Sequence, residues 1–397
     1  MKKHILILTL CCFLLSTFSM TAYAAPENND PAGSTANTLT LEAPCAILME
    51  ASTGTILFEK DSHKQMRPAS ITKIMTMILI FEAIDKGQIS LDDSVTVSEH
   101  AAKMGGSQVF LEVGEQQTVH DLLKCISIAS ANDACVAMAE FIAGSEESFV
   151  GMMNEKAAAL GMKDTHFVNC CGLEADGHLT SANDVSLMAR ELSVQHPQIF
   201  DYCGIWMDTI THHTRKGDSE FGLTNTNKLI RYYSYATGLK TGYTSQSKYC
   251  LAATATRDNI DLIAVVMAEP TPTQRNKEAV MLLDYGFANC QVYQDANEEQ
   301  LKPLNVKRGT QGSVPIDYKN SFSYVITDGS GADSIERSVT LPDSIQAPVH
   351  RGDIVGSVVY TKNGSTIGTV DIIASKDVKK IQLKNCLYHL FRDFVTL

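Results

Sequence analysis

The 397-residue sequence has few aromatic residues and a deficit of positive charge. Phe, Trp and Tyr make up 7% of it, with a single Trp, and 33 Lys and Arg face 45 Asp and Glu, for a net charge of −12. A protein that holds nucleic acid through its phosphates needs a basic surface, and one that binds single strands also needs aromatic stacking platforms. The composition therefore argues against a nucleic-acid partner.

A regular cysteine pattern is also missing. Of the 11 cysteines, Cys11 and Cys12 lie in an N-terminal apolar run, and the other nine are irregularly spaced. An odd number at irregular spacing does not indicate a disulfide framework. No pair has zinc-finger spacing, and the adjacent Cys170 and Cys171 cannot easily bind one metal together. We interpret the cysteines as small core residues, with incidental disulfides left open. No metal or organic cofactor is implied.

The N-terminal residues have the pattern of an export signal. Lys2 and Lys3 precede an apolar run from Ile5 to Phe18, and Ala22-Tyr23-Ala24 offers small residues where a signal peptidase would cleave. Because the run is short and a cleavage site follows it, we predict a secretory signal peptide over residues 1–24 rather than an uncleaved anchor. The remaining chain would be exported, with a net charge of −14.

Residues 25–40 are polar and turn-rich, which is typical of a linker. Strand-like segments follow at 46–50 and 55–59, and two more occur late, at 249–255 and 262–268. The segments between and after them show helical periodicity. The predicted helices cover residues 70–87, 119–142, 147–160, 180–192 and 273–288. Strands at both ends of a helical region predict one α+β domain over residues 41–292.

The pattern changes after about residue 295 to short β-prone runs. These runs cover residues 304–307, 322–327, 338–341, 355–361 and 366–373. Asn363-Gly364 joins the last two and is a signal for a type I′ hairpin turn. We predict a small all-β domain over residues 296–375, and a return to helical structure over residues 376–397.

The first candidate for chemistry is Ser70-Ile71-Thr72-Lys73, where the first long helix begins. Residues three apart share a helix face, so Lys73 could take the hydroxyl proton of Ser70. The N–H groups at a helix N-terminus suit a developing oxyanion. The pattern alone is weak, because Ser245-Gln246-Ser247-Lys248 is a second copy, although one without helical context. The alternative role for Ser70 is a helix cap.

Two further strings carry polar groups. Ser130-Ala131-Asn132-Asp133 interrupts an apolar helix, where its hydroxyl and carboxamide could relay a proton and hold an amide. Its twin, Ser181-Ala182-Asn183-Asp184, stands where a helix cap is needed, and we assign it that role. Lys240-Thr241-Gly242 offers a cation and a hydroxyl for a carboxylate, and Gly242 would let a ligand approach the strand closely. The alternative for this third string is a surface turn.

In this order the strings form a Ser-x-x-Lys, Ser-x-Asn, Lys-Thr-Gly triplet. The sequence closely resembles the low-molecular-mass penicillin-binding proteins that act as D-alanyl-D-alanine carboxypeptidases, peptidase family S11, over about residues 41–397. The resemblance also includes Arg67–Ser70, Gly105–Ser107, Asn132–Ala137, Asn225–Leu229 and Gly238–Thr244. It implies a penicillin-binding/β-lactamase-like transpeptidase domain, an antiparallel sheet with helices, followed by a small all-β domain.

The resemblance implies a role for each part of the triplet. Ser70 would be acylated, Lys73 would be its general base, and Ser130 would pass a proton to the leaving D-alanine. The backbone N–H groups of Ser70 and Tyr243 would form the oxyanion hole.

The remaining implied roles concern substrate binding. Asn132 would hold the substrate amide, and Lys240 and Thr241 would bind the terminal carboxylate with help from Arg275. One departure is that the family often has His where this chain has Cys171, so a deacylation role of that His does not carry over.

The resemblance implies removal of the terminal D-alanine from peptidoglycan pentapeptides, with peptidoglycan stem peptides and β-lactams as the ligands. One alternative is a serine β-lactamase, for which Glu174 lies in the right region to be a deacylation base. A second alternative is a non-catalytic protein that binds muropeptides or β-lactams.

The last 22 residues have an apolar helical face. Its members are Leu383, Leu387, Leu390, Phe391, Phe394 and Val395. Residues 376–397 also hold five basic and two acidic residues, and they are too short and too polar to span a bilayer. We predict a peripheral anchor on the outer face of the cytoplasmic membrane. The alternative is a helix packed on the β domain.

Overall fold

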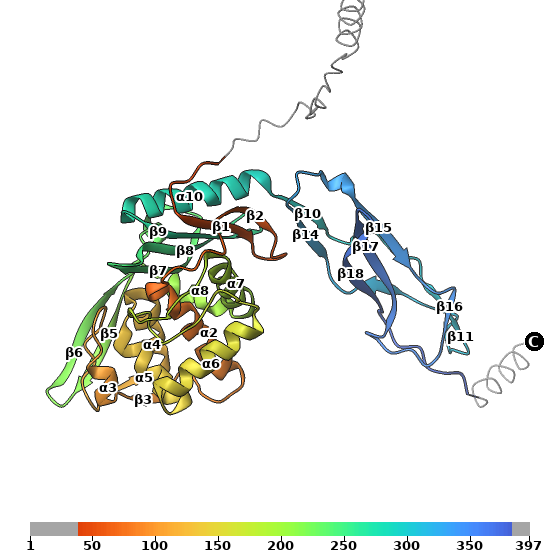
Figure 1. Ribbon diagram of the computed structural model, residues 1–397. Coiled ribbons are helices and arrows are strands. Elements are labelled where there is room, and N and C mark those ends of the chain that lie inside the picture. Colours follow the sequence, from red (N-terminus) through yellow and green to blue (C-terminus); the bar gives the residue numbers. More distant parts are fainter. Residues whose placement is uncertain (1–38, 383–397) are drawn as a thin grey trace, which may run out of the picture. The chain divides into compact units, whose positions relative to one another are not determined.

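A computed structural model describes residues 39–382 of the chain (Figure 1). The predicted signal peptide and the predicted linker as far as residue 38 lie outside these residues. So does segment 383–397, which carries the apolar face of the predicted terminal helix. These three predictions therefore remain predictions.

The first domain is built on a five-stranded sheet in the order β2-β1-β9-β8-β7. Every neighbouring pair is antiparallel. The strands are β1 (Cys45–Glu50), β2 (Ile56–Lys60), β7 (Ala236–Thr244), β8 (Lys248–Arg257) and β9 (Ile260–Glu269). Early and late segments of the chain thus meet in one sheet, which confirms the predicted α+β class. Strand β7 is an edge strand, so one side of its backbone is free of sheet pairing.

Helices cover both faces of this sheet. The long helix α10 (Pro272–Asn289) lies along one face, and the other helices of this domain lie on the opposite side (Figure 1). The main ones are α2 (Lys73–Asp85), α4 (Val119–Lys124), α5 (Asn132–Ala143), α6 (Glu146–Ala159) and α7 (Ala182–Gln195). Ten of the 13 residues of α2 are buried, which matches its nearly all-round apolar sequence. Lys73 is the first residue of α2, and its side chain is buried in the domain core.

The predicted helix over residues 119–142 is interrupted. Helix α4 continues into a π-helical turn, η2 (Cys125–Ala129), and α5 begins only after Ser130. Ser130 has a φ of 62°, in the left-handed region, and this ends the first helix. The twin string behaves as predicted, because the Ser181 hydroxyl accepts a hydrogen bond from the Asp184 N–H and caps α7.

Several short elements were not predicted. The polar hairpin β5 (Met207–Thr214) and β6 (Gly217–Thr224) is one of them. The others are β3 (Ser94–Thr96), β4 (Gln116–Thr118), α3 (Glu99–Ala102), α8 (Phe200–Cys203), α9 (Leu229–Tyr232) and the 3₁₀ turn η3 (Pro197–Ile199). The predicted first helix begins instead with a 3₁₀ turn, η1 (Ala69–Thr72). All eight cysteines of the described residues are free and seven are buried, in line with their predicted role as core residues.

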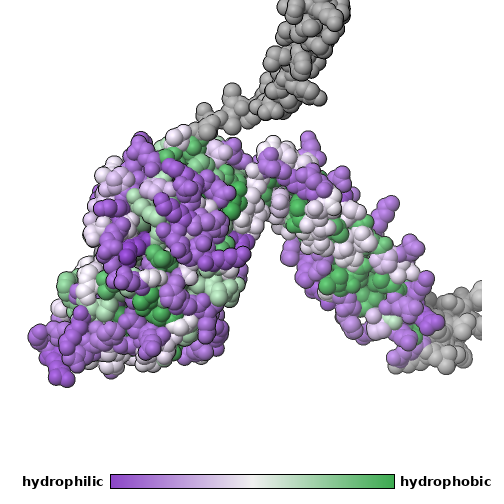
Figure 2. Space-filling view, viewed as in Figure 1, coloured by the Kyte–Doolittle hydropathy of each residue, from purple (hydrophilic) through white to green (hydrophobic). Residues whose placement is uncertain are grey.

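The second domain is all-β, as predicted. Its strands are β10 (Gln291–Asp295), β11 (Leu304–Lys307), β12 (Ser313–Val314), β13 (Ile316–Tyr318), β14 (Phe322–Ile326), β15 (Ile335–Thr340), β16 (Ser344–Gln346), β17 (Ile354–Lys362) and β18 (Ser365–Ala374), with one 3₁₀ turn, η4 (Ala332–Ser334). Asn363 and Gly364 both have positive φ and join β17 to β18, as the type I′ signal indicates. Val358 and Tyr360 are fully buried in its core. Figure 2 shows hydrophobic residues gathered on part of its visible surface.

The prediction of a helix starting at residue 376 is wrong. Residues 376–382 are extended, and they form bridges from Val378 to Val349 and from Lys380 to Gly309. Val378 is 1% exposed and belongs to the β-domain core, which explains why the segment follows the sheet. Three of the five basic residues assigned to the anchor, Lys376, Lys379 and Lys380, therefore lie in the β domain. No helix within residues 39–382 is both long and apolar enough to cross a membrane.

Candidate active site

Ser70 and Lys73 lie at the junction of two helical segments. Ser70 is in the turn η1 and Lys73 is the first residue of α2. The Lys73 Nζ atom lies 3.1 Å from Ser70 Oγ. The Ser70 side chain caps neither segment, so the alternative role as a helix cap is not found.

The environment of Lys73 directs its amine toward the serine. Besides Ser70 Oγ, Lys73 Nζ donates to Asn132 Oδ1 at 2.6 Å and to the carbonyl oxygen of Cys171 at 2.7 Å, and its side chain is fully buried. An ammonium group has three N–H donors, and all three are used here. If the amine loses one proton, the two carbonyl oxygens still hold its two N–H groups. Its lone pair then points at Ser70 Oγ, as proton abstraction from that hydroxyl requires.

A second serine–lysine pair faces the same site. Lys240 Nζ donates to Ser130 Oγ at 2.8 Å and to the carbonyl oxygen of Thr241 at 3.2 Å. Burial lowers the pKa of Lys240 well below its usual range, and the neighbouring charge of Lys73 lowers it further. The left-handed conformation of Ser130 sets its hydroxyl between two helices rather than on a helix face.

Asn132 and Asp133 fix a neighbouring loop. Asn132 Nδ2 donates to the carbonyl oxygen of Gly105 at 2.7 Å, and the Asn132 backbone N–H donates to the carbonyl oxygen of Ser107. The Asp133 carboxylate accepts hydrogen bonds from the backbone N–H groups of Val109 and Leu111. In this structure the Asn132 amide therefore bridges Lys73 and the Gly105 loop, whereas the resemblance assigns it to the substrate.

Strand β7 brings Thr241, Gly242 and Tyr243 to the site. Thr241 Oγ1 donates to Thr226 Oγ1 at 2.7 Å, and Tyr243 is 55% exposed. The structural role of Gly242 differs from the expected one, which was to let a ligand approach the strand. A Cβ atom there would lie 2.9 Å from the carbonyl oxygen of Pro68, so this glycine lets η1 pack against β7 rather than only admitting a ligand.

Arg275 stands in the first turns of α10 with its side chain buried, and its Nε and Nη2 atoms both donate to Asn276 Oδ1. Burial lowers the pKa of Arg275 to about 10. Within residues 39–382 no carboxylate forms a salt bridge with it. A buried guanidinium without a carboxylate partner suits recognition of a substrate carboxylate.

The sequence singled out Cys171 and Glu174 in the segment beside the nucleophile, but not the way this segment packs against it. A Cβ atom on Gly172 would overlap the carbonyl group of Ala69, so this glycine presses on the peptide that precedes Ser70. Asn169 Oδ1 accepts the backbone N–H groups of Gly172 at 2.7 Å and Leu173 at 3.1 Å and shapes this turn. The Cys-Gly-Leu string was visible in the sequence. The sequence did not show that the Cys171 carbonyl would accept a hydrogen bond from Lys73.

Cys171 lies within this turn, at the position where the resemblance implies a histidine. Interaction with the adjacent Cys170 thiol lowers the pKa of Cys171, and the charge of Lys73 acts in the same direction. Its side chain is 1% exposed, so the thiol is part of the core beneath the site.

The competing residues from the sequence contact neither Ser70 nor Lys73, although Glu174 lines a small cavity beside Pro68 and Ala69. Glu174 is exposed, and its carboxylate accepts from the backbone N–H of Gln246 at 3.1 Å and from its Nε2 at 2.7 Å. Ser245 is exposed in the turn that joins β7 to β8, outside any helix.

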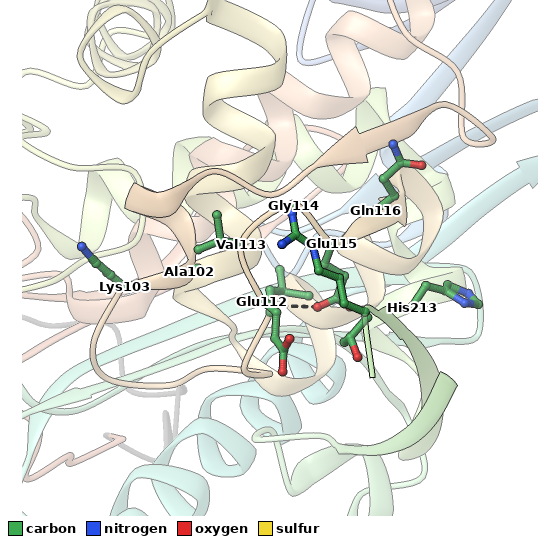
Figure 3. A pocket seen from close by; sticks show the side chains of 11 residues that line it. Ala102, Lys103, Glu112, Val113, Gly114, Glu115, Gln116 and His213 are labelled. Carbon is green, nitrogen blue, oxygen red and sulfur yellow. Dashed lines mark hydrogen bonds between the residues drawn. The ribbon is translucent and has the colours of Figure 1, made fainter. Parts of the chain in front are cut away.

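A cavity of about 800 Å³ opens beside the β5–β6 hairpin, away from the triplet. Figure 3 shows Lys103, Glu112 and His213 among the side chains that line it. None of the triplet residues line it, so we do not connect it with the chemistry of Ser70.

A buried lysine held against a serine, with a second serine–lysine pair opposite, defines a serine hydrolase of the penicillin-recognising class. The chain belongs to the peptidase S11 family, because residues 32–271 match the family model described as D-alanyl-D-alanine carboxypeptidase. Residues 289–380 match the C-terminal domain of penicillin-binding protein 5. The protein is thus a serine-type carboxypeptidase, and the predicted family is confirmed.

Relatives support this assignment over nearly the whole chain. D-alanyl-D-alanine carboxypeptidase DacF of Bacillus subtilis (strain 168) is 41% identical over 379 residues, which cover 95% of each chain. DacC of Escherichia coli (strain K12) is 31% identical, covering 92% of this chain and 90% of that one. The crystal structure of penicillin-binding protein 5 from Haemophilus influenzae has a TM-score of 0.65 and 30% identity, covering 88% and 100% of the two chains.

Proposed function

We propose that this carboxypeptidase works through an acyl-enzyme on Ser70. Lys73 takes the proton of the Ser70 hydroxyl as Oγ attacks the carbonyl of the penultimate D-alanine. Ser130 then passes a proton to the departing D-alanine amine and regains one from the Lys73 ammonium, and water later hydrolyses the ester. The observation that carries the proposal is the triple contact of Lys73, which orients its lone pair toward Ser70 Oγ.

The substrate is a peptidoglycan pentapeptide whose terminal carboxylate binds to Lys240 and Thr241, with Arg275 adding charge. The backbone N–H groups of Ser70 and Tyr243 hold the oxyanion, and Asn132 turns its amide to the substrate when one is bound. A β-lactam enters the same site and leaves a slowly hydrolysed ester on Ser70. The electrostatic support is that Lys240 and Arg275 are both buried cations whose pKa values are lowered by burial.

The place of action follows from the substrate and from the N-terminal signal. The enzyme is exported and acts outside the cytoplasm. Residues 383–397 hold it peripherally on the outer face of the membrane. Support for this comes from the apolar periodicity of that segment in the sequence.

Mass spectrometry of the protein after benzylpenicillin treatment tests the nucleophile. We expect one added penicilloyl group, located by peptide mapping on the peptide that contains Ser70. Ser70→Ala should remove the adduct and also the release of D-alanine from a pentapeptide, whereas Ser245→Ala, which alters the second Ser-x-x-Lys copy, should retain both. An adduct that survives in Ser70→Ala and disappears in Ser245→Ala would overturn the proposal.

A further inference from the structure

A buried histidine joins the nucleophile turn to the segment that covers it. His178 is 2% exposed and has no place in the triplet. Its Nε2 atom lies 2.8 Å from Thr72 Oγ1, and its Nδ1 atom lies 2.9 Å from the backbone nitrogen of Val168. Thr72, fully buried, stands between Ser70 and Lys73 in the Ser-x-x-Lys string.

The direction of each hydrogen bond in this group is fixed by chemistry. The Val168 N–H can only donate, so Nδ1 of His178 must be the unprotonated nitrogen, and the ring proton is on Nε2. Thr72 Oγ1 lies 2.8 Å from the carbonyl oxygen of Ala69 and donates its proton there. Its oxygen therefore accepts the Nε2–H of His178. The result is a one-way chain from Val168 through His178 and Thr72 to the Ala69 carbonyl.

This series of hydrogen bonds ends at the peptide unit between Ala69 and Ser70. The carbonyl of Ala69 and the N–H of Ser70 belong to one planar peptide unit, so a group that fixes the first also fixes the second. Ala69 has a φ of 46°, a conformation that a non-glycine residue keeps only when its surroundings hold it. A hydrogen bond accepted by a peptide carbonyl also makes the N–H of the same unit a better donor.

We propose that His178 and Thr72 are positioning residues, which orient and polarise the Ser70 N–H as an oxyanion donor. The inference deepens the proposed function and rests on it, since it takes Ser70 as the nucleophile. His178 acts in its neutral form, and burial, the first cause of its lowered pKa, favours that form. Neither side chain is assigned a contact with substrate.

The first experiment compares Thr72→Val, which removes the hydroxyl, with Thr72→Ser, which keeps it. Rapid-mixing kinetics with a fluorescent penicillin separate the initial binding constant from the acylation rate. We expect Thr72→Val to lower the acylation rate by about 10- to 100-fold, since small errors of position have effects of this size. Initial binding should change little, and Thr72→Ser should restore the rate to within a few-fold of the wild type.

A second pair of variants tests His178 atom by atom. In His178→Gln the amide nitrogen can take the place of Nε2 and donate to Thr72. In His178→Asn the amide oxygen can take the place of Nδ1 and accept from Val168, but no donor reaches Thr72. We expect His178→Gln to keep most of the acylation rate and His178→Asn to lose it. This order should hold even if His178→Asn has the higher melting temperature of the two. Ser186→Ala serves as control, since it removes a buried hydroxyl that bonds only within α7.

The affinity of a boronic acid that forms a tetrahedral adduct on the nucleophile provides a readout of the oxyanion hole. It should weaken in Thr72→Val and His178→Asn by about the same factor as acylation, and not in Ser186→Ala. If rates instead follow melting temperature across all five variants, His178 and Thr72 are merely core residues and the inference falls. Failure of the wild type to acylate on Ser70 would overturn the proposed function itself, a separate result.

Discussion

Lys240 Nζ and Ser130 Oγ lie 2.8 Å apart, and both side chains are buried. Burial lowers the pKa of Lys240, because the charged form loses the water that would stabilise it. A substrate carboxylate arriving at this lysine would restore the missing counter-charge. In this structure Ser130 Oγ accepts a hydrogen bond from Lys240, so the proposed roles of the two residues would link substrate binding to the proton pathway.

The two lysines should fail in different ways when each is replaced by alanine. Lys73→Ala removes the proposed base, and we expect acylation to slow by about 100- to 10,000-fold while initial binding changes little. Lys240→Ala removes the proposed carboxylate partner, and loss of a charged hydrogen bond should lower kcat/KM for a pentapeptide by about 10- to 150-fold with a raised KM. Steady-state kinetics of D-alanine release and penicillin acylation rates would distinguish them. Two variants with the same pure binding defect would contradict these roles.

Gly172 should tolerate no side chain, because a Cβ atom would overlap a neighbouring carbonyl group. This effect can be measured separately from the penalty of its positive φ. Its φ is 89°, and a Cβ atom would overlap the Ala69 carbonyl. Gly161 has a φ of 73° but nothing within 4 Å of its Cβ position. We expect Gly161→Ala to cost only the conformational penalty, about 1–2 kcal/mol, with acylation unchanged. Gly172→Ala should lower stability further and also slow acylation, measured by thermal unfolding and penicillin kinetics. Equal losses in the two variants would show that the overlap is relieved at no cost.

The buried carboxyl group of Glu269 should make the stability of the fold fall as the pH rises from about 5 to about 8. Glu269 is fully buried beside Glu278, whose carboxylate accepts the backbone N–H groups of Glu42 and Ala43. Burial raises the pKa of Glu269 to about 8, and the negative charge of the neighbouring Glu278 acts in the same direction. Between the ordinary value of 4.5 and about 8, the folded state binds one more proton than the unfolded state, so stability falls as pH rises through this window.

Glu269→Gln stays neutral at every pH and has nearly the same size and shape as the glutamate. We expect it to raise the melting temperature at pH 9 relative to the wild type, by about 2–4 °C for each kcal/mol gained. The difference should shrink toward pH 5. Melting curves of the two proteins at pH 5, 7 and 9 provide the test, and parallel pH dependences would show that Glu269 is ionised in the folded enzyme.

Two C-terminal truncations, after Ser375 and after Gln382, should differ in their effect on the stability of the β domain. A chain ending at Ser375 loses Val378, whose side chain is buried in the β domain at a gain of roughly 1.5–3 kcal/mol for a residue of this type. It also loses the hydrogen bonds between Val378 and Val349. A chain ending at Gln382 keeps both. We expect the longer truncation to remain as stable and active as the wild type and to leave the membrane fraction, and the shorter one to lose β-domain stability. Persistence of the 382-residue form in membranes after signal cleavage would refute the terminal anchor.

The sequence was sufficient for the parts of the site that depend on local spacing. Ser70 and Lys73 are close because they are three residues apart in a helical segment, and the capping role of Ser181 follows from Asp184 three residues later. The Ser-x-x-Lys copy at Ser245 lacks helical context in the structure as well, since it lies in the turn between β7 and β8.

What the sequence could not predict depends on long-range backbone contacts. The Cys171 carbonyl meets Lys73 across 98 positions, and any residue type would provide the same oxygen. His178 was not predicted because a single histidine carries no periodic signal. The extended path of residues 376–382 was missed because tertiary packing of Val378 outweighed a local helical pattern.

The two glycines at the nucleophile turn also bear on inheritance. Gly172 approaches the Ala69–Ser70 peptide from one chain segment, and Gly242 approaches Pro68 and Ala69 from β7. A single mutation that adds a side chain at either position must displace the backbone that carries Ser70. A side chain at either position can therefore be inherited only together with a change that moves the backbone around Ser70 and makes room for it.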